Sequence, residues 1–356
     1  MKVLKMFEMC EPTRNKLVIT GGLGFIGSNI ARSYVESGEF DEILLVDNCN
    51  RGSEKNIEDI KDNVSVVHAD LLSIEETIEC FQGADTVIHL AAVVGGIGLY
   101  ENKPFSVAFQ NSIIDNNVLF SLCVANVNNL FYASTTHVYP HDLQLRPDAP
   151  ALKESDAKLG GQFLSYGAEK MYAEELLSWY AEEEDEDNTS KFNIAVARYC
   201  GIYGPDQDMD LENASLIPAL CHRAAKYPEE PYSIRGNGTE TRSYCYIDDA
   251  VKATKMMINK MKTESFVGPY NVGSDVRYTV RQIAELIAEV SEKGMDIKTK
   301  PEIKASILGQ SCDLTKVNNE LGWYPETSFK EGLKRVYQNI CERLQNEQQK
   351  ISSDSQ

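Results

Sequence analysis

The sequence predicts an α/β fold in which a doubly wound, mainly parallel sheet is joined to a smaller α/β region. Two observations support this prediction. A glycine-rich turn over 20–27 follows a short apolar run and precedes a helical pattern. Beyond it, short β-branched runs alternate with longer helical periods up to about residue 199. This alternation is typical of repeated β-α-β units, whose strands pair in parallel.

The glycine-rich turn is suited to binding phosphate. Gly21, Gly24 and Gly27 recur at three-residue spacing, and a helix is predicted to begin near Phe25 and Ile26. Because these glycines have no side chains, backbone N–H groups can approach a pyrophosphate at the positive end of the helix. We therefore expect all five residues to contact a dinucleotide cofactor.

An acidic residue follows the second predicted strand. Asp47 ends the apolar run 43–46 and lies twenty residues after Gly27. A carboxylate here can accept hydrogen bonds from both ribose hydroxyls of an adenosine, and it repels a 2′-phosphate. The pattern favours NAD, with Asn48 beside the ribose, while the nearby Arg51 leaves NADP open.

The remaining elements continue the alternation. Four more strands are predicted over 64–68, 86–90, 130–134 and 193–198. A helix is predicted from Ser73 to Phe81, with Ser73 as its N-cap and Glu76 as the partner in a capping box. Two longer helices are expected over 106–126 and 166–181.

Ligands of such sheets bind beyond the carboxyl ends of the strands. The residues that follow the third and fourth strands are therefore expected to meet the adenine and the rest of the cofactor. They are Asp70, Leu71, Leu90, Ala91 and Ala92.

The pattern divides the chain into two regions. A Rossmann-type, NAD-binding domain is expected over 12–199, and 243–265 returns to it. After Cys200, glycines and prolines interrupt the alternation of strands and helices, which indicates a substrate-binding region over 200–242 and 266–341. Residues 1–11 and 342–356 are expected to be tails. The carboxylate run 182–187 is interpreted as a solvated loop.

Composition excludes several classes of function. The net charge of −19 argues against a nucleic-acid or anionic membrane surface, and no apolar run is long enough to cross a bilayer. The nine cysteines are dispersed, without a Cys-x-x-Cys pair or a cysteine–histidine cluster. We therefore expect reduced thiols, no metal site and a cytoplasmic protein.

Tyr166 and Lys170 are the main candidates for chemistry. They are four residues apart at the start of a predicted helix, so their side chains share one face. An ammonium and a nicotinamide cation beside a phenol lower its pKa, which makes the phenol a usable base for a sugar or alcohol hydroxyl. The fifth strand ends in Thr135 about thirty residues earlier, so Thr135 is expected to hydrogen-bond the same hydroxyl.

These motifs resemble those of the extended short-chain dehydrogenase/reductase family of nucleotide-sugar epimerases, dehydratases and decarboxylases. The shared segments are 20–27, 46–48, 89–92, Tyr166 with Lys170, 203–205, 241–244 and 246–249. The resemblance covers nearly the whole chain. It implies NAD as cofactor, a nucleoside diphosphate sugar as substrate, and Asn111 among the cofactor contacts.

Within this family the sequence is most similar to the GDP-mannose 3,5-epimerases and then to the GDP-L-fucose synthases. The glycine loop after the fourth strand looks like their sugar-contacting loop, so Gly95, Gly96 and Ile97 are expected sugar contacts. The synthases consume NADPH, which Asp47 argues against. The segments that carry this closer likeness are 94–98, 138–140 and 152–156.

Two positions depart from these enzymes at the acid/base pair. His137 stands where they place a cysteine, and Asp210 aligns with the second member, a lysine or a histidine. An imidazole titrates near neutrality, so His137 with Asp210 could exchange protons beside a transient ketone. The alternative is that His137 only hydrogen-bonds the sugar. Thr136 and His137 occupy the dehydratases' acidic positions, which disfavours 4,6-dehydration.

The expected diphosphate contacts also differ. Gly201 replaces the asparagine that usually precedes the Tyr-Gly-Pro segment, and Gln310 replaces an arginine that usually grips the diphosphate. Arg242 remains, and Arg223 is expected to help it. We therefore assign Thr135, Thr136, His137 and these three side chains, Arg223, Arg242 and Gln310, to substrate binding.

The resemblance thus predicts an NAD-dependent nucleotide-sugar epimerase that works through a transient keto sugar and is similar to the 3,5-epimerases. The alternatives are a 4-epimerase of a UDP- or other NDP-sugar, an NAD(P)-dependent keto-sugar reductase, and a non-catalytic NAD-binding protein. Relatives commonly form a homodimer through two long helices, here 106–126 and 166–181.

Overall fold

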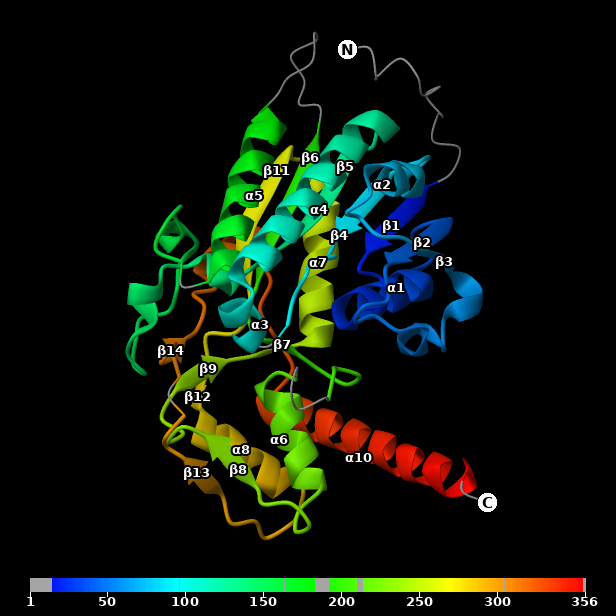
Figure 1. The fold of residues 1–356 in the computed structure, drawn as a ribbon. Coiled ribbons are helices and arrows are strands. Elements are labelled where there is room, and N and C mark those ends of the chain that lie inside the picture. Colours follow the sequence, from blue (N-terminus) through cyan, green and yellow to red (C-terminus); the bar gives the residue numbers. More distant parts are fainter. Residues whose placement is uncertain are drawn as a thin grey trace.

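The computed structural model describes residues 15–95, 97–162, 164–182, 192–209, 214–303 and 305–354. Its centre is a seven-stranded sheet in the order β11-β6-β5-β4-β1-β2-β3, with every neighbouring pair parallel (Figure 1). The strands are β1 (Lys16–Thr20), β2 (Glu42–Asp47), β3 (Ser65–His68), β4 (Thr86–His89), β5 (Asn129–Thr135), β6 (Asn193–Tyr199) and β11 (Phe266–Val272). The predicted doubly wound fold is confirmed, and the strand order reverses between β1 and β4.

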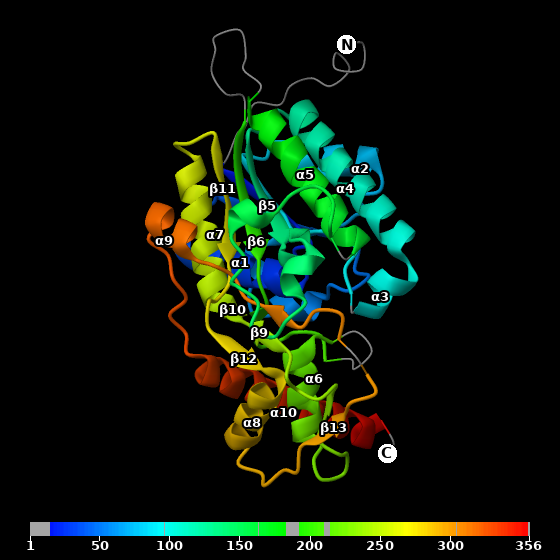
Figure 2. The same ribbon diagram turned by 90° about the vertical axis from the view of Figure 1, so that its left-hand side faces the viewer.

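Helices cover both faces of the sheet (Figure 2). One face carries α1 (Phe25–Ser37) and α7 (Ile247–Met261), and the other carries α2 (Ile74–Phe81), α4 (Pro104–Ala125) and α5 (Ser165–Glu182). Consecutive residues of β1 serve the two faces, because Leu17 and Ile19 belong to one hydrophobic core and Val18 to the other. Burial on both faces explains the uninterrupted apolar run of β1.

The smaller region lies beyond the carboxyl ends of the sheet strands (Figure 1). A three-stranded sheet joins β12, β9 and β14, and two parallel pairs join β10 with β7 and β13 with β8. Helices α6, α8 and α10 pack around these strands. The bounds are β7 (Ile202–Tyr203), α6 (Leu216–Ala225), β8 (Ser233–Arg235), β9 (Thr241–Ser243), β10 (Cys245–Tyr246), β12 (Arg277–Thr279), α8 (Val280–Val290), β13 (Lys298–Lys300), β14 (Gly309–Gln310), α9 (Thr315–Leu321) and α10 (Phe329–Asp354).

The domain boundaries differ from the prediction at two places. Strand β11 belongs to the main sheet, not to the substrate-binding region, because it pairs with β6. The pairing shifts register between Val267 and Tyr270 and then resumes. The Gly-Pro step inside it looked like a break. At the other end, α10 continues to Asp354 and so includes most of the predicted tail 342–356. Buried Leu333 and Val336 hold the first turns of this helix against the core.

The cap of α2 is confirmed only in part. The Ser73 hydroxyl accepts the N–H of Glu76 at 3.3 Å, as expected of an N-cap. The Glu76 carboxylate instead accepts the N–H of Asp70, at 2.8 Å, so the predicted capping box does not close. The carboxylate of Glu76 therefore tightens the chain after β3. Of the predicted carboxylate loop, residues 183–187 lie outside the described residues.

The cysteines also depart from the prediction. Cys200 and Cys312 form a disulfide between the end of β6 and the segment after β14, while six other cysteines of the described residues are free. Sequence spacing could not reveal this pair, because 112 positions separate its members. The cytoplasmic location stays a prediction. Within the described ranges, no helix has the length and apolar character needed to cross a membrane.

Candidate active site

The glycine-rich turn joins β1 to α1 where the strand order of the sheet reverses. Gly21 has a left-handed φ of +67°, and its N–H donates to the carbonyl of Val46 at 2.8 Å. A Cβ at Gly27 would lie 2.3 Å from the carbonyl oxygen of Gly21. Glycine is required at the two positions for different reasons, a left-handed backbone at one and direct packing of α1 on the turn at the other.

The start of α1 fits the pyrophosphate of a dinucleotide. Gly24 is an extended N-cap, and a Cβ there would meet only the carbonyl oxygen of Gly21, at 3.1 Å. The first turn of α1, which begins with Phe25 and Ile26, contains no acidic side chain. An open helix N-terminus without a carboxylate offers N–H donors and the positive end of the helix dipole to an anion.

Asp47 ends β2 and faces the glycine-rich turn. Its carboxylate accepts the N–H groups of Leu23 at 3.1 Å and of Cys49 at 2.9 Å. A Cβ at Gly52 would lie 2.6 Å from Oδ2, so glycine at 52 leaves room for the carboxylate. The side chain of the next residue, Asn48, caps the turn that follows. This placement fits the predicted contact of Asp47 with an adenosine ribose.

Arg51, which left NADP open, is engaged by other groups. Its Nη1 donates to the carbonyl of Val94 at 2.8 Å, and its Nη2 lies 3.2 Å from the carboxylate of Asp208. The guanidinium therefore connects the loop after β2 with the loop after β4 and with the substrate-binding region. Its described contacts give no support for a 2′-phosphate site.

The loop after β4 forms the opposite wall. Leu90 and Ala91 donate their N–H groups to the Thr20 hydroxyl at 3.2 and 3.3 Å. Asn111 of α4 is fully buried, and its side-chain amide bonds both the N–H and the carbonyl of Val93, at 2.6 and 3.2 Å. Asn111, a predicted cofactor contact, thus holds this loop in place.

The residues predicted at the adenine end follow β3. Oδ1 of Asp70 accepts the N–H of Leu72 at 3.0 Å, and the carbonyl of Leu71 accepts the side-chain amide of Asn117 at 2.8 Å. Strand β3 pairs with β2 up to Asp47, so these residues lie beside the predicted ribose contact.

Tyr166 lies in the first turn of α5 against two other rings. Tyr100 of α3 (Ile97–Asn102) stacks on it with ring centroids 5.2 Å apart, and the ring of His137 lies 5.9 Å away, edge-on at 66°. The rings of Tyr100 and His137 are 6.0 Å apart. The three residues form one ring cluster, of which sequence reasoning missed Tyr100. In the sequence, the signal that could have indicated Tyr100 was an aromatic residue shortly after the glycine loop.

The turn after β5 brings Thr135 and His137 next to α5. Oγ1 of Thr135 accepts the N–H of His137 at 3.3 Å at the start of η4 (Thr136–Val138). A Cβ at Gly167 would lie 1.9 Å from the carbonyl oxygen of His137. Residue 167 must therefore be glycine for α5 to pack on this turn and bring Tyr166 close to His137.

The electrostatics of Tyr166 differ from the prediction. Burial raises the pKa of Tyr166 well above its ordinary value, and neighbouring tyrosine and carboxyl groups raise it further. Lys170 donates to the Tyr132 hydroxyl at 2.8 Å and forms an ion pair with Asp115 at 3.5 Å. Within the described residues no hydrogen bond joins Lys170 to Tyr166. The expected lowering of the pKa fails in the protein alone, because burial disfavours the phenolate of Tyr166 and the carboxylate of Asp115 pairs with Lys170.

His137 is neutral at pH 7. Burial lowers its pKa to about 4, and the positive charge of Arg242 contributes. A group with a pKa this far below neutrality is a weak base, although its ring nitrogens still form hydrogen bonds. In the protein alone, His137 is therefore better suited to hydrogen bonding than to removing a proton from carbon.

Two of the predicted substrate-binding residues face each other on adjacent strands. Arg242 of β9 is the register partner of Gln310 of β14. Nη2 of Arg242 donates to the carbonyl of Ile307 at 2.8 Å, and the Gln310 amide donates to Gln144 at 2.8 Å. Arg223 of α6 instead donates to the backbone of β8 at 3.4 Å. Of the two arginines, only Arg242 affects the pKa of the site histidine.

The remaining predicted residues are placed incompletely. The N–H of Gly95 donates to the Tyr100 hydroxyl at 3.1 Å, which ties the glycine loop to the ring cluster. Gly96 and Asp210 lie outside the described residues. Gly201 has a left-handed φ of +61°, and a Cβ there would lie 2.4 Å from the carbonyl oxygen of Ser243, so backbone packing explains this glycine.

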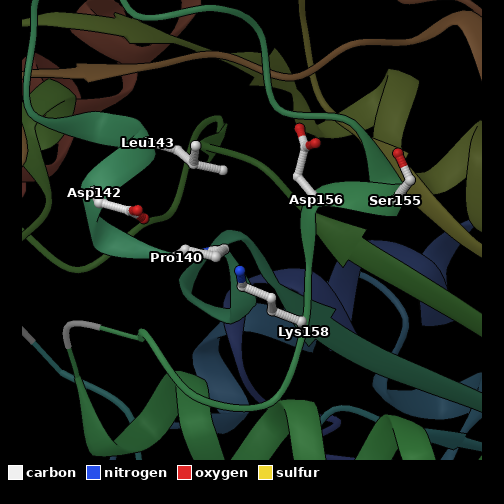
Figure 3. Close-up of a pocket in the computed structure, with 6 residues that line it drawn as sticks. All are labelled: Pro140, Asp142, Leu143, Ser155, Asp156 and Lys158. Carbon is white, nitrogen blue, oxygen red and sulfur yellow. The ribbon is translucent and has the colours of Figure 1, made fainter.

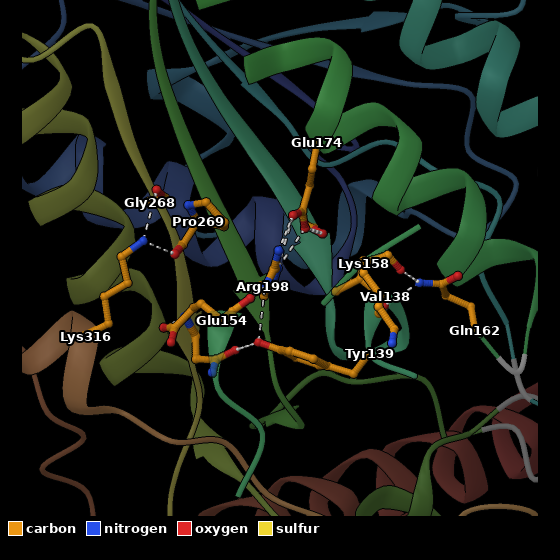
Figure 4. Close-up of polar contacts among 12 residues, drawn as sticks. Val138, Tyr139, Glu154, Lys158, Gln162, Glu174, Arg198, Gly268, Pro269 and Lys316 are labelled. Carbon is orange, nitrogen blue, oxygen red and sulfur yellow. Dashed lines mark hydrogen bonds and ion pairs between the residues drawn. The ribbon is translucent and has the colours of Figure 1, made fainter. Parts of the chain in front are cut away.

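A buried ion pair supports the turn after β5 from behind (Figure 4). Nε and Nη2 of Arg198 lie 3.0 and 2.5 Å from the two carboxylate oxygens of Glu174, and Nη1 donates to the Tyr139 hydroxyl and the Glu154 carbonyl. Glu174 also accepts the hydroxyl of Ser134, next to Thr135. This network connects α5, β5 and β6 around the predicted catalytic residues.

A pocket of about 270 Å³ lies between η5 (His141–Gln144) and η6 (Glu154–Asp156). None of its lining residues belongs to the predicted site. They are Pro140, Asp142, Leu143, Ser155, Asp156 and Lys158 (Figure 3). Among the described residues, no group of three or more His, Cys, Asp or Glu side chains could hold a metal ion.

Comparison with known proteins decides the family. The sequence model of the NAD dependent epimerase/dehydratase family matches residues 17–273. The chain belongs to this family. This member of the epimerase/dehydratase family is 29% identical to GDP-mannose 3,5-epimerase of Arabidopsis thaliana over 351 residues, which is 98% of this chain and 88% of that protein. It is 30% identical to GDP-mannose 3,5-epimerase 1 of Oryza sativa subsp. japonica over 334 residues, 93% and 83% of the two chains.

Solved structures agree with this family. A UDP-glucose 4-epimerase with UDP-glucose from Thermotoga maritima has a TM-score of 0.79 at 26% identity, covering 92% of this chain and 99% of that one. A UDP-glucose 4-epimerase from Thermus thermophilus in complex with NAD shares the fold, with a TM-score of 0.73 at 22% identity over 91% and 98% of the two chains. The predicted epimerase/dehydratase family, Rossmann-type fold and NAD cofactor are confirmed.

Proposed function

We propose that this protein is an NAD-dependent epimerase of a nucleoside diphosphate sugar that acts through a transient keto sugar, in the manner of a GDP-mannose 3,5-epimerase. The observation that carries the proposal is the meeting of Tyr166, Thr135 and His137 in one site, on the side of the sheet where the glycine-rich turn opens. The sequence identity to two GDP-mannose 3,5-epimerases, which extends over most of each chain, supports the same proposal.

The residues of the chain divide the work. The glycine-rich turn and Asp47 would hold NAD, which when bound supplies a reversible acceptor for hydride. Tyr166 would take the proton of a sugar hydroxyl and later return it, while the Thr135 hydroxyl fixes the position of that oxygen. Arg242 would face the anionic part of the substrate. Oxidation to a ketone makes the protons on the neighbouring carbons acidic, and His137 would contact them.

A second candidate is a 4-epimerase, which turns the keto sugar over and returns hydride to its other face. The low pKa of His137 favours this candidate, because a weak base is poorly suited to removing a proton from carbon. The fold likeness to the UDP-glucose 4-epimerase of Thermotoga maritima is compatible with it.

Heavy water separates the two candidates. The purified protein is incubated in deuterium oxide with GDP-, UDP-, CDP- and dTDP-sugars, and the products are examined by NMR and mass spectrometry. Deuterium at carbon 3 or 5 is the expected result for a 3,5-epimerase. A new isomer without deuterium would establish inversion at carbon 4 instead.

Two controls complete this experiment. The absorbance of reduced nicotinamide should show no net change with substrate, because an epimerase regenerates its cofactor; stoichiometric oxidation or reduction would mean a keto-sugar reductase. Tyr166→Phe removes the proposed base and should lower turnover about 10²- to 10⁴-fold. A Tyr166→Phe protein that kept full activity would contradict the catalytic role of Tyr166.

We also infer that the protein forms a homodimer through α4 and α5. The aromatic side chains exposed along these helices support this inference. They are Phe105 (77% exposed), Phe109 (53%), Phe120 (44%), Tyr172 (46%) and Trp179 (55%). Large exposed aromatics gathered on two adjacent helices are characteristic of protein interfaces.

A further inference from the structure

A buried polar chain runs from the glycine-rich turn into the protein. The hydroxyl of Thr20, just before the turn, lies 2.7 Å from Nδ1 of His89, and Nε2 of His89 lies 3.0 Å from Oδ1 of Asp115. A carboxylate can only accept, so Nε2 of His89 carries the proton and the Thr20 hydroxyl donates to Nδ1. The exposed fractions of Thr20, His89 and Asp115 are 0%, 1% and 4%. His89 thereby fixes one oxygen of Asp115.

The second oxygen of Asp115 holds the catalytic lysine. Oδ2 accepts the hydroxyl of Tyr132 at 2.6 Å and lies 3.5 Å from Nζ of Lys170. The ammonium also donates to the Tyr132 hydroxyl at 2.8 Å and lies 4.5 Å from the centre of that ring. Lys170 is 2% exposed, so no solvent competes for these contacts. The lysine is held toward β5 by a carboxylate, a hydroxyl and a ring.

Glu169 completes the cluster without adding a charge. It is 7% exposed, its carboxyl group interacts electrostatically with that of Asp115, and its Oε2 has no partner among the described residues. Burial raises the pKa of Glu169 to about 9, which keeps it protonated at neutral pH. Burial alone would raise the pKa of Asp115, but the charge of Lys170 and the hydrogen bond from His89 hold this pKa below its ordinary value. The cluster therefore contains one cation, one anion and one neutral acid.

We propose that Asp115 is a positioning residue for the hydroxyl chemistry of Tyr166: it holds the Lys170 ammonium against Tyr132 and cancels its charge, so that this ammonium does not stabilise a phenolate at Tyr166 in the protein alone. This inference rests on the role proposed above for Tyr166. Asp115 lies one helical turn after Asn111 on α4, so a single helix supports both the cofactor loop and the lysine.

The groups that can influence this titration come from six elements. The titratable side chains around Tyr166 and Lys170 are His89 of β4, Tyr100 of α3, Asp115 of α4, Tyr132 of β5, His137 of η4 and Glu169 of α5. At neutral pH, Asp115 is the only one of these that carries a charge opposite to that of Lys170. Removal of that one carboxylate should therefore expose Tyr166 to the lysine.

The test follows the ionisation of Tyr166 in full-length protein without added ligand. Tyrosine labelled with ¹³C at Cζ reports phenol and phenolate by NMR, and Tyr166→Phe assigns the signal. In the wild type, Tyr166 should remain a phenol up to about pH 10, the ordinary tyrosine value. In Asp115→Asn the midpoint should fall by about 1–3 pH units relative to the wild type, the size of shift that a nearby charge produces. Asp115→Asn combined with Lys170→Met also removes the uncompensated ammonium and should return the midpoint to within about half a unit of the wild-type value.

Each outcome decides a separate point. An unchanged Tyr166 midpoint in folded Asp115→Asn, or an equal fall in the variant that also carries Lys170→Met, would overturn the inference. Asp115→Ser, which leaves room for water, gives the same comparison if the asparagine variant does not fold. A crystal structure of the wild type with Nζ of Lys170 bonded to the Tyr166 hydroxyl and beyond hydrogen-bond distance of Asp115 would also overturn it.

The pH profile of turnover separates this inference from the proposed function. If a sugar is converted, the acid limb of kcat should move to lower pH in Asp115→Asn by the same amount as the Tyr166 midpoint. If no sugar is converted but the midpoint moves as expected, the proposed function fails and the role of Asp115 stands. If a sugar is converted and the midpoint does not move, the proposed function stands and the role of Asp115 fails.

Discussion

Loss of the ion pair between Glu174 and Arg198 should be the most damaging change to the support of the active site. Arg198 makes three contacts of 2.5–3.1 Å with Glu174, and the two side chains are 3% and 5% exposed. Glu174→Gln leaves a buried guanidinium without its counter-charge. Breaking a buried pair by removing one partner costs about 3–5 kcal/mol. The Tyr139 hydroxyl and the Glu154 carbonyl remain as acceptors, so we expect about 3 kcal/mol rather than 5.

Urea unfolding followed by circular dichroism measures this loss. The matched control is Glu289→Gln, which removes an ion pair of 2.5 Å with Lys330 whose side chains are 60% and 55% exposed. An exposed pair contributes about 0–1 kcal/mol, so the control should unfold almost as the wild type does. Replacement of both buried partners, Glu174→Leu with Arg198→Met, should cost less than Glu174→Gln alone, because no buried charge remains unpaired. A loss below about 1 kcal/mol in Glu174→Gln would refute the reasoning.

Three further predictions concern the turn after β5 and the exposed helices. Gly167→Ala should abolish turnover and lower the melting temperature, because its Cβ would lie 1.9 Å from a carbonyl oxygen, whereas Gly294→Ala meets nothing within 4 Å and should behave as the wild type. The folded pKa of His137 lies below its unfolded value of 6.5, so its contribution to stability is lost as pH falls from about 6.5 toward 4. His137→Gln should therefore lose less stability than the wild type over this range in urea unfolding, and an equal loss would contradict the shift. Trp179→Glu should convert the dimer to a monomer in sedimentation, while Val276→Glu, at a site 49% exposed elsewhere, should not.

Local sequence was sufficient to predict most of the fold. The apolar runs of β1, β2, β4, β5 and β6 are buried on both faces of the sheet, so their β-branched residues and their length identify them without long-range information. The failures have local causes. Gly268 and Pro269 interrupt the pattern of β11, yet the strand bulges around them and continues. The polar surface of α10 hides a narrow buried stripe that includes Leu333 and Val336.

The site was predictable where a motif carries it and unpredictable where contacts depend on tertiary packing. Spacing made Tyr166 and Lys170 candidates, and the end of β5 made Thr135 one. No local pattern shows that Tyr100 stacks on Tyr166, since the two rings meet only when α3 packs on α5. The ion pair that compensates the charge of Lys170 was likewise unpredictable, because its partner Asp115 is 55 positions away in the sequence.

The alternation of Leu17, Val18 and Ile19 between two cores has a consequence for how this chain can change over time. Each of these residues is fitted to different neighbours, so a substitution in β1 affects the helices of one face and leaves the other face intact. A deletion of one residue would exchange the two sets of side chains and place both in the wrong core. Point changes in β1 are therefore open to gradual compensation, while any change of its length must coincide with a rebuilding of both sides of the molecule.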